Sequence, residues 1–174
     1  MKKMRAGLAT FLTFSALIGV TALTSPVVSA DTVKLSTSQK IQLQYLVEEE
    51  KLARDVYTYL LATSGSQKFR NIASSEQTHM NLISGILKTY RISNPRIGEK
   101  PGVFKNATLA NLYKKLIGSG KVDYAGAIAA GVTIEKLDIA DLKNDIKAET
   151  ASDVISVLNT LLQGSYNHLA AFTR

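Results

Sequence analysis

The chain contains no cysteine, and among its 174 residues there are only two histidines and three prolines. Without cysteine the protein cannot form disulfides, thiolate zinc sites or iron–sulfur clusters, and it has no cysteine nucleophile. Any metal binding or acid–base chemistry must therefore use oxygen and imidazole groups. The chain also lacks a phosphate-binding P-loop, the dinucleotide-binding glycine pattern and a Ser/His/Asp arrangement supported by spacing.

Basic residues outnumber acidic residues only modestly. The chain has 21 lysine and arginine residues against 14 aspartate and glutamate residues, a formal net charge of +7. Three basic residues, Lys2, Lys3 and Arg5, lie in a segment that we expect to be removed, and without them the charge is +4. This charge is mild and is not clustered with aromatic residues, so nucleic acid is not the expected partner.

The first thirty residues have the pattern of a secretory signal peptide. Residues 1–5 are basic, residues 6–24 are uncharged, and Val28-Ser29-Ala30 ends the segment in the small-x-small order of a cleavage site. Cleavage after Ala30 leaves one mature domain, residues 31–174, which works outside the cytoplasm without a stable membrane anchor. The alternative is a retained anchor, because the uncharged run approaches the length that spans a bilayer.

Apolar residues recur at helical spacing in four long segments of the mature chain, and no segment alternates apolar and polar residues for long. The class is therefore all-α, with long helices expected over residues 36–63, 67–90, 123–146 and 151–172. The long link after residue 90 holds two prolines and contains a short helix over residues 107–117. Ser36, Asn106 and Thr150 are the expected N-caps. One long link between two short ones predicts a four-helix bundle of two antiparallel hairpins.

In each long helix, acids or histidines replace apolar residues on the face that should meet the core. They are Glu50 in the first helix, Glu76 and His79 in the second, Glu135 and Asp138 in the third, and His168 in the fourth. Four carboxylates in one apolar layer are costly unless they are neutralised, and two divalent cations would neutralise them. The alternative is a buried hydrogen-bonded network without metal.

The assignment of faces is less direct for two helices. In the first helix three acids are consecutive, and the spacing places Glu50 on the core face while Glu48 and Glu49 point elsewhere. In the third helix an equally good apolar face, which includes Ala130 and Ile134, lies beside the face that carries Glu135.

Two motifs resemble those of the ferritin-like superfamily, whose members are four-helix bundles with a di-iron carboxylate site: Glu50 with Tyr57 seven residues later, and the Glu76-x-x-His79 pair. Four motifs resemble more narrowly those of an uncharacterised ferritin-like family of archaea and bacteria: EEEKLARDVY at residues 48–57, SEQTH at 75–79, IEKLDI at 134–139 and NHLAAF at 167–172. This narrower resemblance extends from about residue 35 to residue 172. It implies a ferritin-like fold and the metal ligands Glu50, Glu76, His79, Glu135 and His168. Asp138 matches a second acid that rubrerythrin-type relatives carry one turn later.

The chain departs from the di-iron pattern in the fourth helix. Most relatives have Glu-x-x-His there, whereas this chain has Ser165 three residues before His168. One carboxylate is therefore missing, and Asp138 is the nearby acid that would substitute for it. Lys136 and Ala170 replace a Glu and an Arg of the narrower family, and Lys136 would weaken metal binding if it paired with an acid of the site.

The resemblance implies a protein that binds two iron ions, with manganese or a mixed pair as the alternative. The expected signal peptide makes this protein a secreted one. The implied chemistry is oxidation of ferrous iron, or reduction of oxygen or peroxide. Tyr57 lies one layer along the same face as Glu50, where it would hydrogen-bond a ligand carboxylate, donate one electron, or serve only as a core tyrosine. A different hypothesis is a non-catalytic extracellular binding or surface module with a degenerate metal site.

Overall fold

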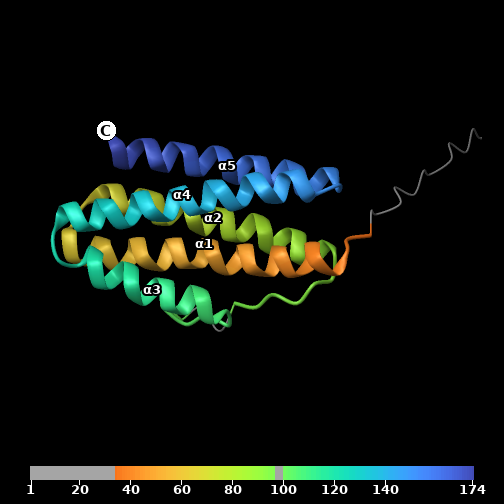
Figure 1. The fold of residues 1–174 in the computed structure, drawn as a ribbon, viewed down its shortest axis with the longest axis horizontal. Coiled ribbons are helices and arrows are strands. Elements are labelled where there is room, and N and C mark those ends of the chain that lie inside the picture. The colour runs from red at the N-terminus through yellow and green to blue at the C-terminus, as the bar shows by residue number, and fades with distance from the viewer. Residues whose placement is uncertain (1–33, 97–99) are drawn as a thin grey trace, which may run out of the picture. The chain divides into compact units, whose positions relative to one another are not determined.

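The computed structural model describes residues 34–96 and 100–174, and the expected signal segment, residues 1–30, lies outside these ranges. The described residues form five helices and no strand, which confirms the all-α class. The helices, labelled in Figure 1, are α1 (Thr37–Ser64), α2 (Gln67–Thr89), α3 (Ala107–Gly120), α4 (Tyr124–Ala148) and α5 (Ser152–Thr173). None of these five helices is both long enough and apolar enough to cross a membrane.

Local sequence signals determine where α1 begins and ends. The Ser36 hydroxyl accepts a hydrogen bond from the Gln39 backbone N–H (3.2 Å), and the Gln39 side chain accepts one from the Ser36 N–H (2.7 Å). This reciprocal pair is the predicted capping box. At the other end Gly65 has φ of 66°, the left-handed conformation that glycine adopts without steric cost. The chain therefore turns sharply into α2.

The predicted N-caps have mixed outcomes. Asn106 caps α3 as predicted, because its side chain accepts from the Thr108 and Leu109 N–H groups. The prediction for α5 is wrong, since its N-cap is Ala151 and not Thr150. The Glu149 carboxylate accounts for the difference: its Oε1 accepts from the N–H groups of Thr150 (2.7 Å) and Ala151 (2.8 Å).

The four long helices form two antiparallel hairpins, α1 with α2 and α4 with α5 (Figure 1). α1 also contacts α4, and α2 also contacts α5, so the two hairpins face each other. The long connection after α2 leads to α3, which runs back along α1, and as a result α2 and α4 point in the same direction. α3 packs against α1 and α4.

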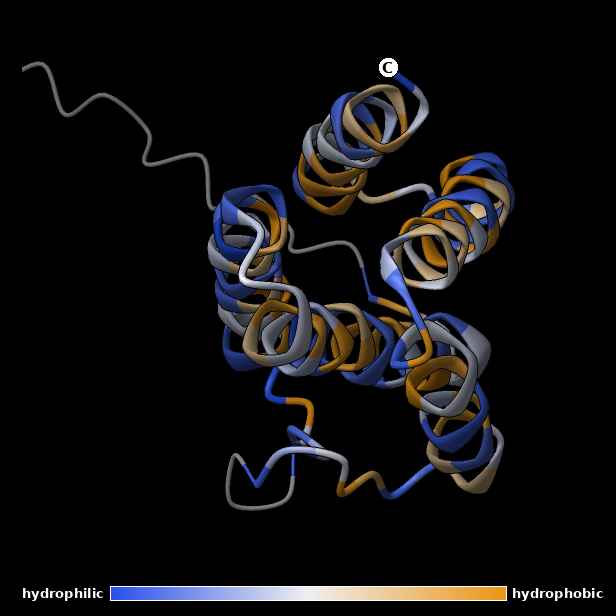
Figure 2. Cartoon of the chain, turned by 90° about the vertical axis from the view of Figure 1, so that its left-hand side faces the viewer, coloured by the Kyte–Doolittle hydropathy of each residue, from blue (hydrophilic) through white to orange (hydrophobic). Residues whose placement is uncertain are grey.

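Two apolar clusters fill the bundle on either side of a polar layer. One cluster contains the packed rings of Tyr57, Phe69 and Phe172, and the other is formed mainly by aliphatic residues such as Leu46 and Leu161. Figure 2, which looks along the helices, shows hydrophobic residues on each of them. Between the clusters most of the buried positions are polar, and they come from α1, α2, α4 and α5. The polar layer is therefore shielded from water at both ends.

Buried charges of α1 hold the connection between α2 and α3. The Lys51 ammonium is fully buried, pairs with Asp55 and donates to the Lys100 carbonyl oxygen (2.8 Å). Asp55 accepts from the Gly102 N–H (3.0 Å). Glu48, which the spacing excluded from the core face, is also buried, and it accepts from the N–H groups of Lys105 (2.5 Å) and Asn106 (3.0 Å). These contacts place α3 over α1.

Replacing Lys51 with Met is expected to destabilise the fold by about 3 kcal/mol, because it removes the cation of a buried pair and leaves the Asp55 charge less compensated. Urea unfolding followed by circular dichroism measures this change. The control Lys88→Met alters an exposed lysine in the last turn of α2 and should cost about 0.5 kcal/mol or less. Equal effects of the two substitutions would contradict a role for the Lys51 pair.

Candidate metal centre

The polar layer brings together every metal ligand proposed from the sequence. Its members lie on four helices and are no more than 7% exposed, and they are Glu50 of α1, Glu76 and His79 of α2, Glu135 and Asp138 of α4, and Ser165 and His168 of α5. In α4, the face that carries Glu135 and the neighbouring apolar face both contribute to the interior, since Ala130, Ile134 and Glu135 are all buried. Lys136 is exposed.

Glu76 lies between the two histidines and offers one oxygen to each. Its Oε2 is 2.8 Å from His79 Nδ1, and its Oε1 is 2.9 Å from His168 Nδ1. Glu50 Oε2 is 3.2 Å from His79 Nδ1, and Glu135 Oε2 is 3.5 Å from His168 Nδ1. The two imidazole rings stack with their centroids 5.5 Å apart. The site thus has two similar halves that meet at Glu76.

Each half supplies three ligand atoms close enough to surround one ion. In one half these are atoms of Glu50, Glu76 and His79, and in the other half they are atoms of Glu76, Glu135 and His168. Within each half the ligand atoms lie within 4.8 Å of one another. Carboxylate and imidazole ligands together suit iron, manganese and zinc. The shared Glu76 would bridge two such ions.

Two further side chains hold the carboxylates in place. The Tyr57 hydroxyl donates to Glu135 Oε1 at 2.5 Å, so Tyr57 is buried and hydrogen-bonded to a candidate ligand, as predicted. The Ser165 hydroxyl donates to Asp138. Ser165 of α5 thus holds an acid of α4 in the layer. Asp138 belongs to neither group of three ligands, but its charge acts on the same acids.

Burial makes the carboxylates of the layer hard to ionise. It raises the pKa of Glu50 to about 8, although the hydrogen bond with His79 opposes this, and it raises the pKa of Glu135 to about 7. Burial and the charge of Glu50 also hold the pKa of Asp138 well above its usual range. Glu76 differs because its interactions with both histidines outweigh the effect of burial and lower its pKa to about 2.

The histidines retain protons in the metal-free protein. Burial disfavours the charged imidazole of His79, but hydrogen bonds with Glu50 and Glu76 outweigh it and raise the pKa to about 11. Burial also disfavours the charged imidazole of His168, but interactions with Glu135 and Glu76 outweigh it and raise the pKa to about 9. In the absence of metal, protonated histidines therefore compensate part of the negative charge of the layer.

Two buried oxygens of the layer have no hydrogen-bond partner, namely Glu50 Oε1 and Asp138 Oδ1. An unpaired polar atom in an apolar environment costs free energy, and buried groups normally have a partner. Both atoms belong to acids whose chemistry suits divalent metal ions. The residues present therefore fit a dinuclear metal centre.

A groove of about 590 Å³ between α2 and α5 reaches the edge of the centre at His79. Its other lining residues carry no charge, and they include Ser75, Thr78, Asn167 and Gly164. A Cβ at position 164 would collide with the His79 imidazole, so glycine is needed there for the ring to fit. Gly164 was not among the residues predicted from the sequence, although a glycine in the middle of a long helical pattern is itself a signal of close approach.

Glu49 was also missed, because the spacing turned it away from the core face. It is only 6% exposed and faces α4, where burial and the charges of Asp138, Asp141 and Asp145 hold its pKa well above the usual range. Burial and the charges of Asp141 and Glu149 raise the pKa of Asp145 to about 6. The three aspartates follow one another at spacings of three and four residues, which places them on one face of α4. That spacing is the signal that would have identified this acidic face.

The metal-free protein is expected to lose stability as the pH rises from about 5 to about 9. Glu50 and Glu135 have folded pKa values above the ordinary 4.5, and His79 and His168 have values above the ordinary 6.5. In this window the folded state therefore binds more protons than the unfolded chain, and its stability falls with pH. The low pKa of Glu76 acts in the opposite direction, but only below this window, because its stabilising contribution is lost as the pH falls from about 4.5 to about 2.

Melting temperatures measured in the presence of a chelator test this expectation. The Glu50→Gln, Glu135→Gln double variant should show a flatter pH profile, because two of the titrating groups are gone. A melting temperature that is constant or rises between pH 5 and pH 9 would contradict the assigned direction.

The comparisons with known proteins agree with the helical fold. The model of the family described as "Uncharacterized protein domain (DUF2202)" matches residues 39–174. The protein named "Uncharacterized protein MJ0754" of Methanocaldococcus jannaschii is 44% identical over 140 residues, which cover 80% of this chain and 76% of the relative. The crystal structure of hypothetical protein MJ0754 from Methanococcus jannaschii DSM 2661 has a TM-score of 0.78 at 43% identity and covers 79% of each chain. The chain therefore belongs to the DUF2202 family.

Proposed function

We propose that the protein is a secreted, ferritin-like protein that binds a dinuclear metal centre of two iron ions, with manganese or a mixed pair as the alternative. The observation that carries this proposal is the position of Glu76, whose two oxygens face two different histidines. Each of these histidines has a further carboxylate at its Nδ1 atom. A carboxylate shared by two similar ligand groups is the arrangement expected of a bridging ligand between two ions.

The arrangement of the helices supports the ferritin-like part of the proposal. Two antiparallel hairpins joined by one long connection are characteristic of ferritin-like bundles. In di-iron carboxylate bundles two helices each supply a Glu, and each of the other two supplies a Glu-x-x-His pair. Glu50 of α1 and the Glu76/His79 pair of α2 follow this pattern, and Glu135 of α4 supplies the second single Glu.

The fourth helix departs from the pattern in a way that the fold compensates. Ser165 occupies the position of the missing glutamate, and its hydroxyl holds Asp138 of α4 in the same layer. Because Asp138 Oδ1 has no hydrogen-bond partner, this oxygen remains able to serve as a ligand. We therefore assign Asp138 as the acid that replaces the fourth-helix glutamate.

Bound iron would supply electrons for the reduction of oxygen or peroxide, which is the chemistry proposed for this site. The chain's own residues orient the ligands and control protons and water. Tyr57 holds Glu135 by a hydrogen bond and acts as a positioning residue, and a role as one-electron donor stays a prediction. The two apolar clusters exclude water from both sides of the layer. His79 and His168 would release protons on binding a metal ion, because only the unprotonated nitrogen can be a ligand.

Metal analysis tests the proposal directly. After anaerobic incubation with ferrous iron, and separately with manganese, the chain should retain about two ions, because two groups of three ligands are present. His79→Ala and His168→Ala should each abolish tight binding at one half, and Glu76→Ala should abolish it at both halves. Elemental mass spectrometry measures the ion content, and circular dichroism checks that helicity is unchanged.

Asn167→Ala is a matched control, because Asn167 is exposed and adjacent to His168. This variant should retain the same metal content as the wild-type protein. If the wild-type protein retains neither metal, the proposed centre is wrong, and the structure serves a non-catalytic extracellular module with a degenerate site.

Metal binding is expected to release protons and to strengthen as the pH rises from about 6 to about 9. At pH 7 the raised pKa values of His79, His168 and Glu50 keep these groups protonated in the metal-free protein, and each must lose its proton to become a ligand. Calorimetric titration in two buffers of different ionisation enthalpy should detect about two or more protons released per chain. Proton-neutral binding would contradict the assigned ligands.

A further inference from the structure

We infer that divalent cations reach the proposed centre along a line of carboxylates between α1 and α4, which starts at a surface pocket near the beginning of α1. This line consists of Asp145, Asp141, Glu49 and Asp138 and is called the acidic seam below. The inference rests on the proposed function, since it assigns the route by which that centre acquires its metal. It adds a second place where the chain would interact with a cation.

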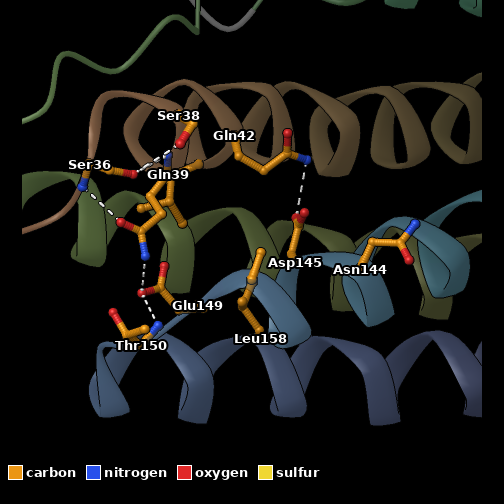
Figure 3. A pocket seen from close by; sticks show the side chains of 11 residues that line it. Ser36, Ser38, Gln39, Gln42, Asn144, Asp145, Glu149, Thr150 and Leu158 are labelled. Carbon is orange, nitrogen blue, oxygen red and sulfur yellow. Dashed lines mark hydrogen bonds between the residues drawn. The ribbon is translucent and has the colours of Figure 1, made fainter.

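The pocket has a volume of about 490 Å³ and lies where the start of α1 meets the end of α4. Figure 3 shows Gln39 and Gln42 of α1 reaching across to Glu149 and Asp145. The Gln39 Nε2 donates to Glu149 Oε1 (2.8 Å), and the Gln42 Nε2 donates to Asp145 Oδ2 (3.2 Å). None of the residues that line the pocket is basic, so its only formal charges are negative.

The acidic seam extends from this pocket toward the polar layer. Asp138, Asp141 and Asp145 lie on one face of α4 and cover about 10 Å along the helix at 1.5 Å per residue. Asp145 lines the pocket, and the Glu49 carboxyl group of α1 shares a hydrogen bond with Asp141. Each acid of the seam is therefore within electrostatic range of another acid on the way to the centre.

Glu49 gives independent support for a cation in this seam. Its side chain is buried, and its Oε2 has no hydrogen-bond partner. The groups that act on Glu49 electrostatically are acids, and one of them, Asp141, shares a hydrogen bond with its carboxyl group. A buried carboxyl oxygen without a hydrogen-bond partner is costly. A passing divalent cation would supply a partner for this oxygen.

The burial of the acids increases from the surface pocket toward the proposed centre, as expected of a route into the protein. Glu149, Asp145 and Asp141 are half-buried, whereas Glu49 and Asp138 are buried. Among the described residues, only the two ligand groups around Glu76 bring three ligand atoms close enough to hold an ion. The acidic seam therefore attracts and passes cations, and the ligand groups retain them.

Electrostatics favours this path over the groove at His79. Without the expected signal segment the chain carries a formal charge of +4, and this net positive charge disfavours the approach of cations to the surface as a whole. The groove between α2 and α5 has no charged lining residue other than His79, if that residue is protonated, and it offers a cation no attraction. A line of acids in a partly buried seam focuses the potential and raises the local cation concentration.

Stopped-flow loading with Co²⁺ tests the inference, because the visible absorption of Co²⁺ reports its coordination. The metal-free 174-residue chain is mixed with Co²⁺, and the loading rate is measured at several salt concentrations. The Asp141→Asn, Asp145→Asn double variant should load at least about tenfold more slowly and with weaker salt dependence. Its final content should still be two Co²⁺ per chain, because the ligand groups are intact.

Two further variants sharpen the test. Glu49→Gln changes a single acid inside the seam and should also slow loading, which provides a second test if the double variant folds poorly. Asp123→Asn removes the same type of charge at the other end of α4 and retains a capping residue, so its loading rate should equal that of the wild-type protein.

The outcomes separate the route from the centre. If the wild-type chain binds two Co²⁺ and all variants load at the wild-type rate, the acidic seam is not the route. If Gln163→Lys, which places a positive charge in the groove at His79, slows loading while the seam variants do not, cations use the groove and the inference is overturned. If the wild-type chain binds no Co²⁺, the proposed centre fails and the route fails with it.

Discussion

The structure depends on the compensation of buried charge around Glu76. This carboxylate lies between two imidazole nitrogens at 2.8 and 2.9 Å, and these contacts keep it ionised while burial disfavours ionisation of the other acids in the layer. A charged layer inside a bundle requires partners for its charges and an apolar surrounding on both sides. The two apolar clusters supply that surrounding, and they confine the polar residues to one level of all four long helices.

The same constraint accounts for the pairing of Ser165 on α5 with Asp138 on α4. Both side chains are buried, and the Ser165 hydroxyl donates a hydrogen bond to the Asp138 carboxyl group. The exposed Lys136 does not enter the layer, so the expected interference of a lysine with the site has no structural basis.

The two hairpins meet at two seams that differ in chemistry. Between α1 and α4 acids continue from the surface to the polar layer, whereas between α2 and α5 an uncharged groove ends at His79. Gly164 allows the histidine ring to reach the groove wall, and no larger residue fits. A charged ion and a neutral small molecule would therefore approach the proposed centre from different sides. α3 covers part of the α1 surface and is held there by the buried Lys51–Asp55 pair and by Glu48.

The sequence by itself determined the helical class, most helix ends and the core position of Glu50, Glu76, His79, Glu135, Asp138 and His168. These features follow from local rules, since the period of the helix and the caps act within a few residues. Tertiary structure decided that Glu76 is shared by two histidines, that Ser165 holds Asp138, and that Glu48 and Glu49 are buried. These features depend on contacts between helices that are distant in the chain. The period of one helix predicts which of its residues face the core, but it does not specify which neighbouring helix the other residues will contact.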